Sequence, residues 1–137
     1  MNKHVLKSRE RAFFGKEEKL KSKKLIDLLF KEGKSIKKNS LKCLYLSPDE
    51  TLSSPIQVMV SVPKKQFKKA VDRNLIKRRI REAYRLNKNT LVQLCREENK
   101  QLILAFLFQN TAIAEYNTIE TDIKKILAEL IDKLSKN

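Results

Sequence analysis

The sequence has few of the residues on which most enzyme sites and extracellular folds depend. Its 137 residues include one histidine, two cysteines, two glycines, three prolines and no tryptophan. Cys43 and Cys95 lie far apart and form no CxxC pair, so we expect free thiols in a reducing compartment. Glycine and proline are too rare to mark a linker, which favours a single domain over residues 1–137.

Groups for catalysis or metal binding are also scarce. His4 lies beside the N-terminus, and the acidic pairs Asp49–Glu50 and Glu97–Glu98 lack the further ligands of a two-metal site. A glycine-rich phosphate loop is missing as well. We therefore predict that the chain has no catalytic residues, holds no metal and binds no cofactor by itself.

Long apolar runs are absent too. The run LILAFLF at 102–108 has seven residues, whereas a membrane-spanning helix needs about 18. No apolar stretch near the N-terminus resembles a secretory signal. We expect a cytoplasmic protein without a membrane segment.

Positive charge, in contrast, is abundant and unevenly placed. The net charge is +15; residues 1–38 hold 13 Lys or Arg against 5 acids, and residues 64–88 hold 11 against 2. Charge concentrated in two segments costs self-repulsion in the folded state. We therefore expect a polyanionic partner, of which nucleic acid is the commonest kind.

The hydrophobic patterns predict an α/β (α+β) two-layer sandwich with helices packed on a mixed sheet. The expected order is α-β-β(-β)-α-β-α, with one more short strand allowed between the first two strands and the basic helix, and residues 1–20 form a loosely ordered basic arm. The predicted helices cover 22–34, 67–88, a short segment from Thr90, and 115–135; the predicted strands cover 40–47, 56–63 and 101–109.

The strand at 56–63 alternates clearly, which is typical of a sheet with one buried face and one open face. Ile56, Val58, Val60 and Val62 should face the core. The side chains expected on the open face are Gln57, Met59 and Ser61.

The segment KKAVDRNLIKRRIREAYRLNK at 68–88 holds nine Lys or Arg and predicts a helix with two distinct sides. The inward side consists of Ile76, Ile80, Ala83 and Tyr84. The opposite side is a stripe without an acidic residue, formed by Asn74, Lys77, Arg78, Arg81, Arg85 and Lys88. Solvated helix faces ordinarily mix charges of both signs, so this stripe favours contacts with phosphates.

The segment SVPKKQFKKAVDRNLIKRRIRE at 61–82 resembles the signature of the bacterial ribonuclease P protein subunit. Leu20, Phe30 and Gly33 also fit the pattern that precedes the family's first strand. The matching residues are Ser61, Lys64, Lys65, Ala70, Val71, Arg73, Asn74, Lys77, Arg78 and Arg81.

The resemblance implies a subunit that supports removal of the 5′ leader from precursor tRNA, with catalysis by an RNA that uses Mg²⁺. It implies ribonuclease P RNA and precursor tRNA as partners, no DNA, and a left-handed β-α-β crossover. The residues expected to bind the catalytic RNA are Lys64, Lys65, Lys68, Lys69, Arg73, Asn74, Lys77, Arg78, Arg81 and Arg85.

The resemblance also implies a leader cleft between the first helix and the sheet. Apolar and aromatic platforms beside a basic groove suit the binding of a single strand with little sequence preference. The candidate cleft residues are Ile26, Phe30, Phe14, Tyr45, Gln57, Met59 and Ser61.

Two positions depart from the family pattern. Leu75 replaces an RNA-facing arginine, and Ile26 stands where an aromatic residue often lines the cleft. We expect Leu75 to be partly exposed at the edge of the binding surface, with Arg79 supplying the missing charge.

Three other functions fit parts of the sequence. A structural RNA-binding protein of the ribosomal type shares the basic composition and differs only in lacking the signature spacing. A DNA-binding helix is usually preceded by another helix, whereas here a strand comes first. A membrane-surface helix would need Ile76, Ile80 and Tyr84 to face the lipid, whereas we expect these residues in the core.

Overall fold

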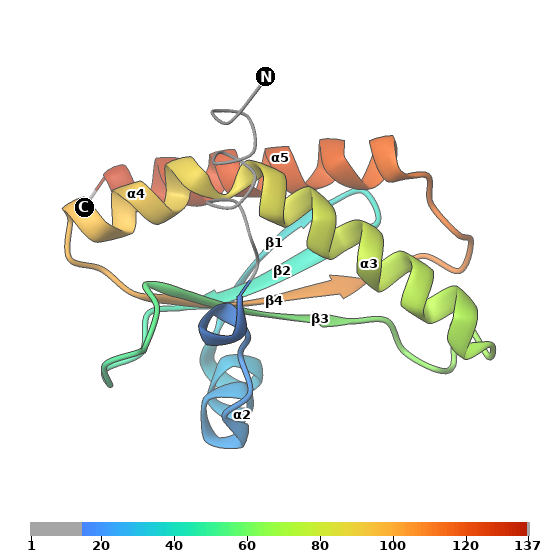
Figure 1. Cartoon of the computed structure of the whole chain (residues 1–137), viewed down its shortest axis with the longest axis horizontal. Helices are drawn as coiled ribbons and strands as arrows, with labels where there is room; N and C mark the ends of the chain where they lie inside the picture. The colour runs from blue at the N-terminus through green and yellow to red at the C-terminus, as the bar shows by residue number, and fades with distance from the viewer. Residues whose placement is uncertain (1–14, 137) are drawn as a thin grey trace.

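Four strands form one mixed sheet in the order β1-β2-β4-β3 in this computed structural model, which describes residues 15–136 (Figure 1). Strands β1 and β2, and likewise β2 and β4, pair antiparallel, while β3 and β4 pair parallel. The elements in chain order are η1 (Lys16–Glu18), α2 (Lys23–Glu32), β1 (Lys34–Lys38), β2 (Leu41–Leu46), β3 (Ile56–Ser61), α3 (Ala70–Asn87), α4 (Asn89–Glu97), β4 (Leu102–Phe108) and α5 (Tyr116–Ser135).

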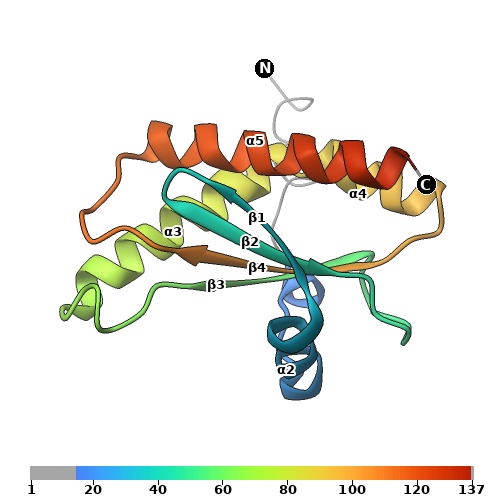
Figure 2. The ribbon, with the colours of Figure 1, turned by 180° about the vertical axis from the view of Figure 1, so that it is seen from behind.

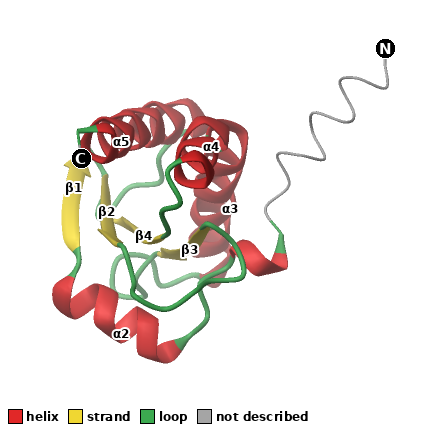
Figure 3. Ribbon diagram, turned by 90° about the vertical axis from the view of Figure 1, so that its left-hand side faces the viewer, coloured by secondary structure: helices red, strands yellow, loops and turns green. Residues whose placement is uncertain are grey.

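The two faces of the sheet carry different helices. Helices α3, α4 and α5 cover one face and enclose the main core, while α2 crosses the other face (Figures 2 and 3). Under α2 lies a smaller core of Leu20, Leu25, Leu29, Leu44, Ile103 and Ala105. The predicted mixed α/β architecture is confirmed, with the difference that α2 covers part of the face expected to be open.

The first helix begins and ends where the sequence indicates. The Ser22 side chain caps it by accepting a hydrogen bond from the Leu25 N–H at 3.2 Å. At the other end, the Gly33 N–H donates to the Leu29 carbonyl at 2.8 Å. The chain then enters β1 directly.

Strand β1 is an additional short strand, and it comes directly after α2, whereas the predicted order allowed an extra strand only after the first two. Its sequence KSIKK contains one apolar residue, Ile36, which is buried opposite Cys43 of β2. A single buried side chain gives almost no alternation, so the strand depends on pairing with β2 rather than on its own pattern.

Residues 16–20, predicted to belong to a loose arm, are instead held against the sheet. Lys19 forms a parallel bridge with Val58 of β3, and the Leu20 N–H donates to the Val58 carbonyl at 2.9 Å. Leu20 is buried in the smaller core. The rest of the proposed arm, residues 1–14, lies outside the described residues.

The connection from β3 to β4 has the uncommon left hand. Viewed as in Figure 3, the chain recedes along β3, returns above the sheet through α3 and α4, and recedes again along β4, which lies to the left of β3. Parallel β-α-β units are nearly always right-handed. The crossover implied by the resemblance is therefore present.

Candidate nucleic-acid interface

Helix α3 buries the inward side that the sequence predicts. Ile76, Ile80 and Ala83 are completely inaccessible, and Tyr84 is buried with its ring centroid 5.7 Å from that of Phe106 in β4. These side chains are committed to the main core. The main apolar side of the helix is therefore not available to a membrane surface.

The outward side of α3 borders a concave surface of about 400 Å³. Asn74, Arg78 and Arg81 are exposed there. The residues lining this concavity, which we call the α3 groove, are Lys19, Asn74, Arg78, Arg81, Glu82 and Arg85. Most of the predicted stripe is thus a continuous surface, and it is joined by a lysine from the N-terminal segment.

The α3 groove also includes an acidic residue from the flank of the stripe, Glu82. The Arg85 guanidinium donates to both carboxylate oxygens of Glu82, at 3.0 and 2.7 Å. These hydrogen bonds hold the pKa of the Glu82 carboxyl below its usual value and raise the pKa of Arg85. Arg85 is therefore already paired before any RNA binds.

Arg73 and Lys77 are less available than their spacing indicates. The Arg73 guanidinium donates to the carbonyls of Phe67 and Lys68 at 2.7 and 3.0 Å, which closes the turn leading into α3. Arg73 and Lys77 are both half-buried. Arg73 therefore shapes the start of the surface as well as adding charge to it.

Lys88, predicted to extend the stripe, points elsewhere. It lies at the junction of α3 and α4, is 3% exposed, and its ammonium forms an ion pair with Glu18 of η1. Helical spacing could not show this, because the partner, Glu18, lies 70 residues away in the sequence.

The loop between β3 and α3 presents four of the predicted lysines. Phe67 is buried, with its ring centroid 6.0 Å from that of Phe108, and anchors the loop. The Gln66 amide donates to the carbonyls of Phe108 and Asn110 at 3.1 and 2.6 Å. The exposed residues on either side of these anchors are Lys64, Lys65, Lys68 and Lys69.

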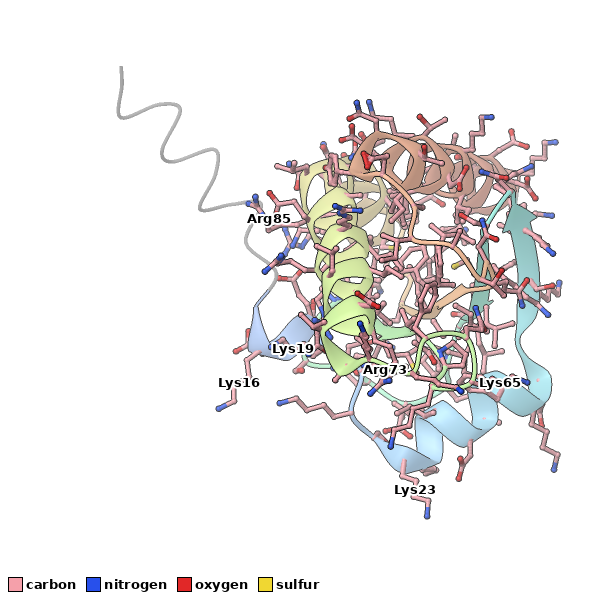
Figure 4. All side chains as sticks on the ribbon, turned by 90° about the vertical axis from the view of Figure 1, so that its right-hand side faces the viewer. Lys16, Lys19, Lys23, Lys65, Arg73 and Arg85 are labelled. Atoms are coloured by element: carbon pink, nitrogen blue, oxygen red, sulfur yellow. The ribbon has the colours of Figure 1, made fainter. Side chains whose placement is uncertain are left out.

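The N-terminal segment adds cations that the site prediction missed. Lys16 and Lys19 lie on the same side of the molecule as Arg73 and Arg85 of α3 (Figure 4). The positive excess in residues 1–38 was a signal for them, but sequence spacing could not show that Lys19 borders the α3 groove.

The candidate leader residues lie partly on the face that α2 crosses. Met59 and Ile26 pack against the smaller core, and Phe30 projects from α2 with 50% of its surface exposed. The Gln57 amide donates to the Glu17 carbonyl at 3.1 Å. Ser61 is half-buried at the end of β3. These five side chains come from two elements, α2 and β3.

Tyr45 does not belong to this set. It packs against the main core on the opposite face of the sheet, beside Leu130 and Leu134 of α5. Strand β2 buries residues on both faces, so its sequence does not reveal which set of alternating side chains faces α2. Leu44 and Leu46 take that direction instead. Phe14 lies outside the described residues.

Leu75 is half-buried, as expected. Arg79, in contrast, does not supply the missing charge at the binding surface. Its guanidinium donates to the Ala114 carbonyl at 2.6 Å and ties α3 to the loop before α5.

Between residues 15 and 136 the chain has no histidine and two cysteines. In that range, no group of three or more His, Cys, Asp or Glu could hold a metal ion. Cys43 and Cys95 are buried, and burial raises the pKa of the Cys95 thiol to about 11. The helices between residues 15 and 136 also include none with the length and apolar character of a membrane span.

The fold and its basic surface define a small α/β protein suited to a polyanionic ligand. The family model for ribonuclease P matches residues 14–131. The ribonuclease P protein component of Porphyromonas gingivalis is 35% identical over 121 residues, covering 87% of this chain and 88% of the relative. That of Chlorobaculum tepidum is 34% identical over 120 residues, covering 81% and 78%.

Solved structures agree on the fold. The ribonuclease P protein of Staphylococcus aureus superimposes with a TM-score of 0.63 at 20% identity, covering 84% of this chain and 96% of that one. The protein from Thermotoga maritima also gives 0.63, at 22% identity, covering 82% and 96%. This chain belongs to the ribonuclease P protein family.

Proposed function

We propose that the chain binds ribonuclease P RNA through the α3 groove and the lysines of the β3–α3 loop. Family membership makes it the protein component of a bacterial ribonuclease P, the endonuclease of tRNA maturation in which RNA is the catalyst. The supporting observation is the α3 groove, where exposed Arg78 and Arg81 meet Lys19 from another element. Guanidinium groups suit bidentate phosphate contacts.

The face crossed by α2 is our candidate for the 5′ leader of precursor tRNA. Phe30 offers an exposed ring, and Met59 and Ile26 offer apolar surface nearby in the smaller core. A single strand can stack bases on such side chains without reading sequence. Tyr45 is excluded from this surface because it lies on the other face of the sheet.

Mg²⁺ belongs, in this proposal, to the RNA of the complex. The chain contributes positive charge that lowers the repulsion between two polyanions, the catalytic RNA and the precursor tRNA. The protein should therefore matter most when Mg²⁺ is scarce, because fewer cations then screen the phosphates.

The direct test combines a bacterial ribonuclease P RNA with precursor tRNA at low Mg²⁺, with and without this chain. We expect 5′ processing to increase when the protein is added, and this gain to fall as salt increases. A structural RNA-binding protein of the ribosomal type would bind RNA without accelerating leader removal. Unchanged processing would reject the proposed function.

A further inference from the structure

The ion pair between Glu18 and Lys88 joins segments 70 residues apart, and Glu18 directly precedes Lys19, which lines the α3 groove. Both side chains are largely withdrawn from solvent, with 21% of Glu18 and 4% of Lys88 exposed. Burying a charge costs several kcal/mol unless a partner and hydrogen bonds compensate. A buried ion pair therefore contributes little net stability in many proteins, so a role other than stability is worth considering for this pair.

Glu18 links the N-terminal segment to the junction of α3 and α4. One carboxylate oxygen accepts from the Lys88 ammonium, and the other accepts from the Gly15 N–H at 2.8 Å. On its other side, the segment is tied to β3, since the Gln57 amide donates to the Glu17 carbonyl and the Leu20 N–H to the Val58 carbonyl. The backbone of residues 15–20 is thus fixed between β3 and the junction of α3 and α4.

Lys19 lies within this fixed segment and borders the α3 groove. Its neighbours across the groove are Asn74, Arg78 and Arg81 of α3. In the free protein, bringing an additional ammonium toward these guanidinium groups is unfavourable, because like charges repel. An attachment that holds Lys19 there becomes favourable when a phosphate occupies the groove.

We infer that the Glu18–Lys88 pair positions Lys19 as a phosphate contact of the α3 groove. Glu18 and Lys88 are positioning residues in this inference, and Lys19 is the residue that touches the RNA backbone. The inference rests on the proposed function, because the phosphate in question belongs to ribonuclease P RNA.

Replacement of Glu18 distinguishes a positioning role from a general effect of net charge on RNA affinity. Glu18→Gln raises the net charge, so a purely electrostatic effect would tighten RNA binding. Loss of positioning predicts the opposite: affinity for ribonuclease P RNA about fivefold weaker, and a salt slope smaller by about one contact. Glu17→Gln is the matched control, because Glu17 is exposed and, within residues 15–136, forms no ion pair.

A second pair of variants tests whether Glu18 acts through Lys19. Lys19→Ala should weaken binding by a similar factor, and Lys19→Ala combined with Glu18→Gln should be no weaker than Lys19→Ala alone, because both remove the same contact. Additive losses would show that Glu18 does not act through Lys19 and would overturn the inference.

The double variant Glu18→Gln with Lys88→Met is the control for effects on folding, because it removes both charges of the buried pair. We expect this variant to have the thermal unfolding midpoint of the native chain and still to bind RNA weakly. Recovery of native affinity would mean that the pair serves stability alone, against the inference. So would a Glu18→Gln variant that binds as tightly as Glu17→Gln.

Failure of the inference and failure of the proposed function give different results. If the unaltered chain does not bind ribonuclease P RNA, the function itself is wrong. If it binds, and Arg78→Ala with Arg81→Ala weakens binding while Glu18→Gln does not, only the positioning role is wrong.

Discussion

The cations along α3 differ in how far they are free to meet a phosphate. Arg73 and Arg85 are already engaged, with backbone carbonyls and with Glu82 respectively. Arg78 and Arg81 are exposed, and neither forms an ion pair with a residue of the described range 15–136. A guanidinium without a protein partner gives up less when it binds phosphate. These two arginines should therefore contribute most to RNA affinity.

Replacing both free arginines tests this ranking. Arg78→Ala with Arg81→Ala should reduce affinity for ribonuclease P RNA by at least tenfold and lower the salt slope by about two, because two phosphate contacts are lost. Thermal unfolding should change little, since both side chains are exposed. Filter binding over a series of salt concentrations measures the affinity and the slope together.

The control removes equal charge elsewhere. Lys124 and Lys125 are exposed on α5, away from the α3 groove. Lys124→Ala with Lys125→Ala should alter the salt slope much less than the arginine pair does. Equal effects from the two double variants would show that net charge, and not the α3 groove, governs binding.

Substitutions at Phe30 and its neighbour Leu29 distinguish leader binding from core packing. Phe30→Ala should weaken binding of precursor tRNA with a long leader while hardly changing stability, because half of the side chain is exposed. Leu29→Ala should destabilise the fold by about 2–5 kcal/mol, because Leu29 is completely buried in the smaller core. Leader-length dependence is the measurement for Phe30; if the variant binds long and short leaders like the native chain, this ring does not contact the leader.

At the scale of elements, periodicity identified most of the fold. Helices α3 and α5 have long apolar stripes, and β3 alternates regularly, so local sequence carries their type and their buried side. Strand β1 has one buried residue, Ile36, and no such pattern. It forms a strand because it pairs with β2, and the local sequence does not reveal that pairing.

The errors at the candidate site have a common physical origin. Tyr45 was placed on the wrong face because β2 is buried on both sides. Lys88 and Arg85 were placed among free cations because their partners, Glu18 and Glu82, are not marked as partners by spacing alone. Contacts between distant segments decide which charges are available, and helical spacing reports only where they point.

Gly33 joins α2 to β1 and is the element-scale position most sensitive to substitution. A Cβ there would lie 2.4 Å from the Leu29 carbonyl oxygen and 2.9 Å from Leu29 Cδ1. Gly33→Ala should therefore push α2 away from β1 and cost about 1–3 kcal/mol in the free energy of unfolding. Urea unfolding measures the cost, with Ser35→Ala on the exposed side of β1 as the control. Equal urea midpoints for the two variants would contradict the predicted clash.

At the scale of the whole molecule, two basic segments of the sequence meet on one side. Lys16 and Lys19 come from the segment 1–38, and the cations of α3 come from the segment 64–88 (Figure 4). The acid-containing α5 packs on the other side of α3 from the groove, with Glu120 bonded to Asn87 and Tyr116. The fold thus converts two separate charge excesses into one surface for a polyanion.

The buried thiols predict how the stability of the whole chain responds to alkaline pH. Desolvation raises the pKa of Cys43 well above its usual value and that of Cys95 to about 11. In the unfolded chain both thiols ionise from about pH 8.5, while in the folded chain they stay protonated. The folded state therefore binds more protons above that pH, and its stability should fall as pH rises toward 11.

Comparison with a thiol-free variant isolates this contribution from the titration of the many lysines. Cys43→Ala with Cys95→Ala should be less stable than the native chain at pH 7, because both side chains fill the core. Between pH 8.5 and 10.5 the difference should narrow by an amount on the order of 1 kcal/mol per pH unit for each thiol. Urea unfolding of both proteins under reducing conditions, at pH 7, 9 and 10.5, measures it. A difference that stays constant would mean that the thiols titrate alike in the folded and unfolded chains, and so that burial does not hold them protonated.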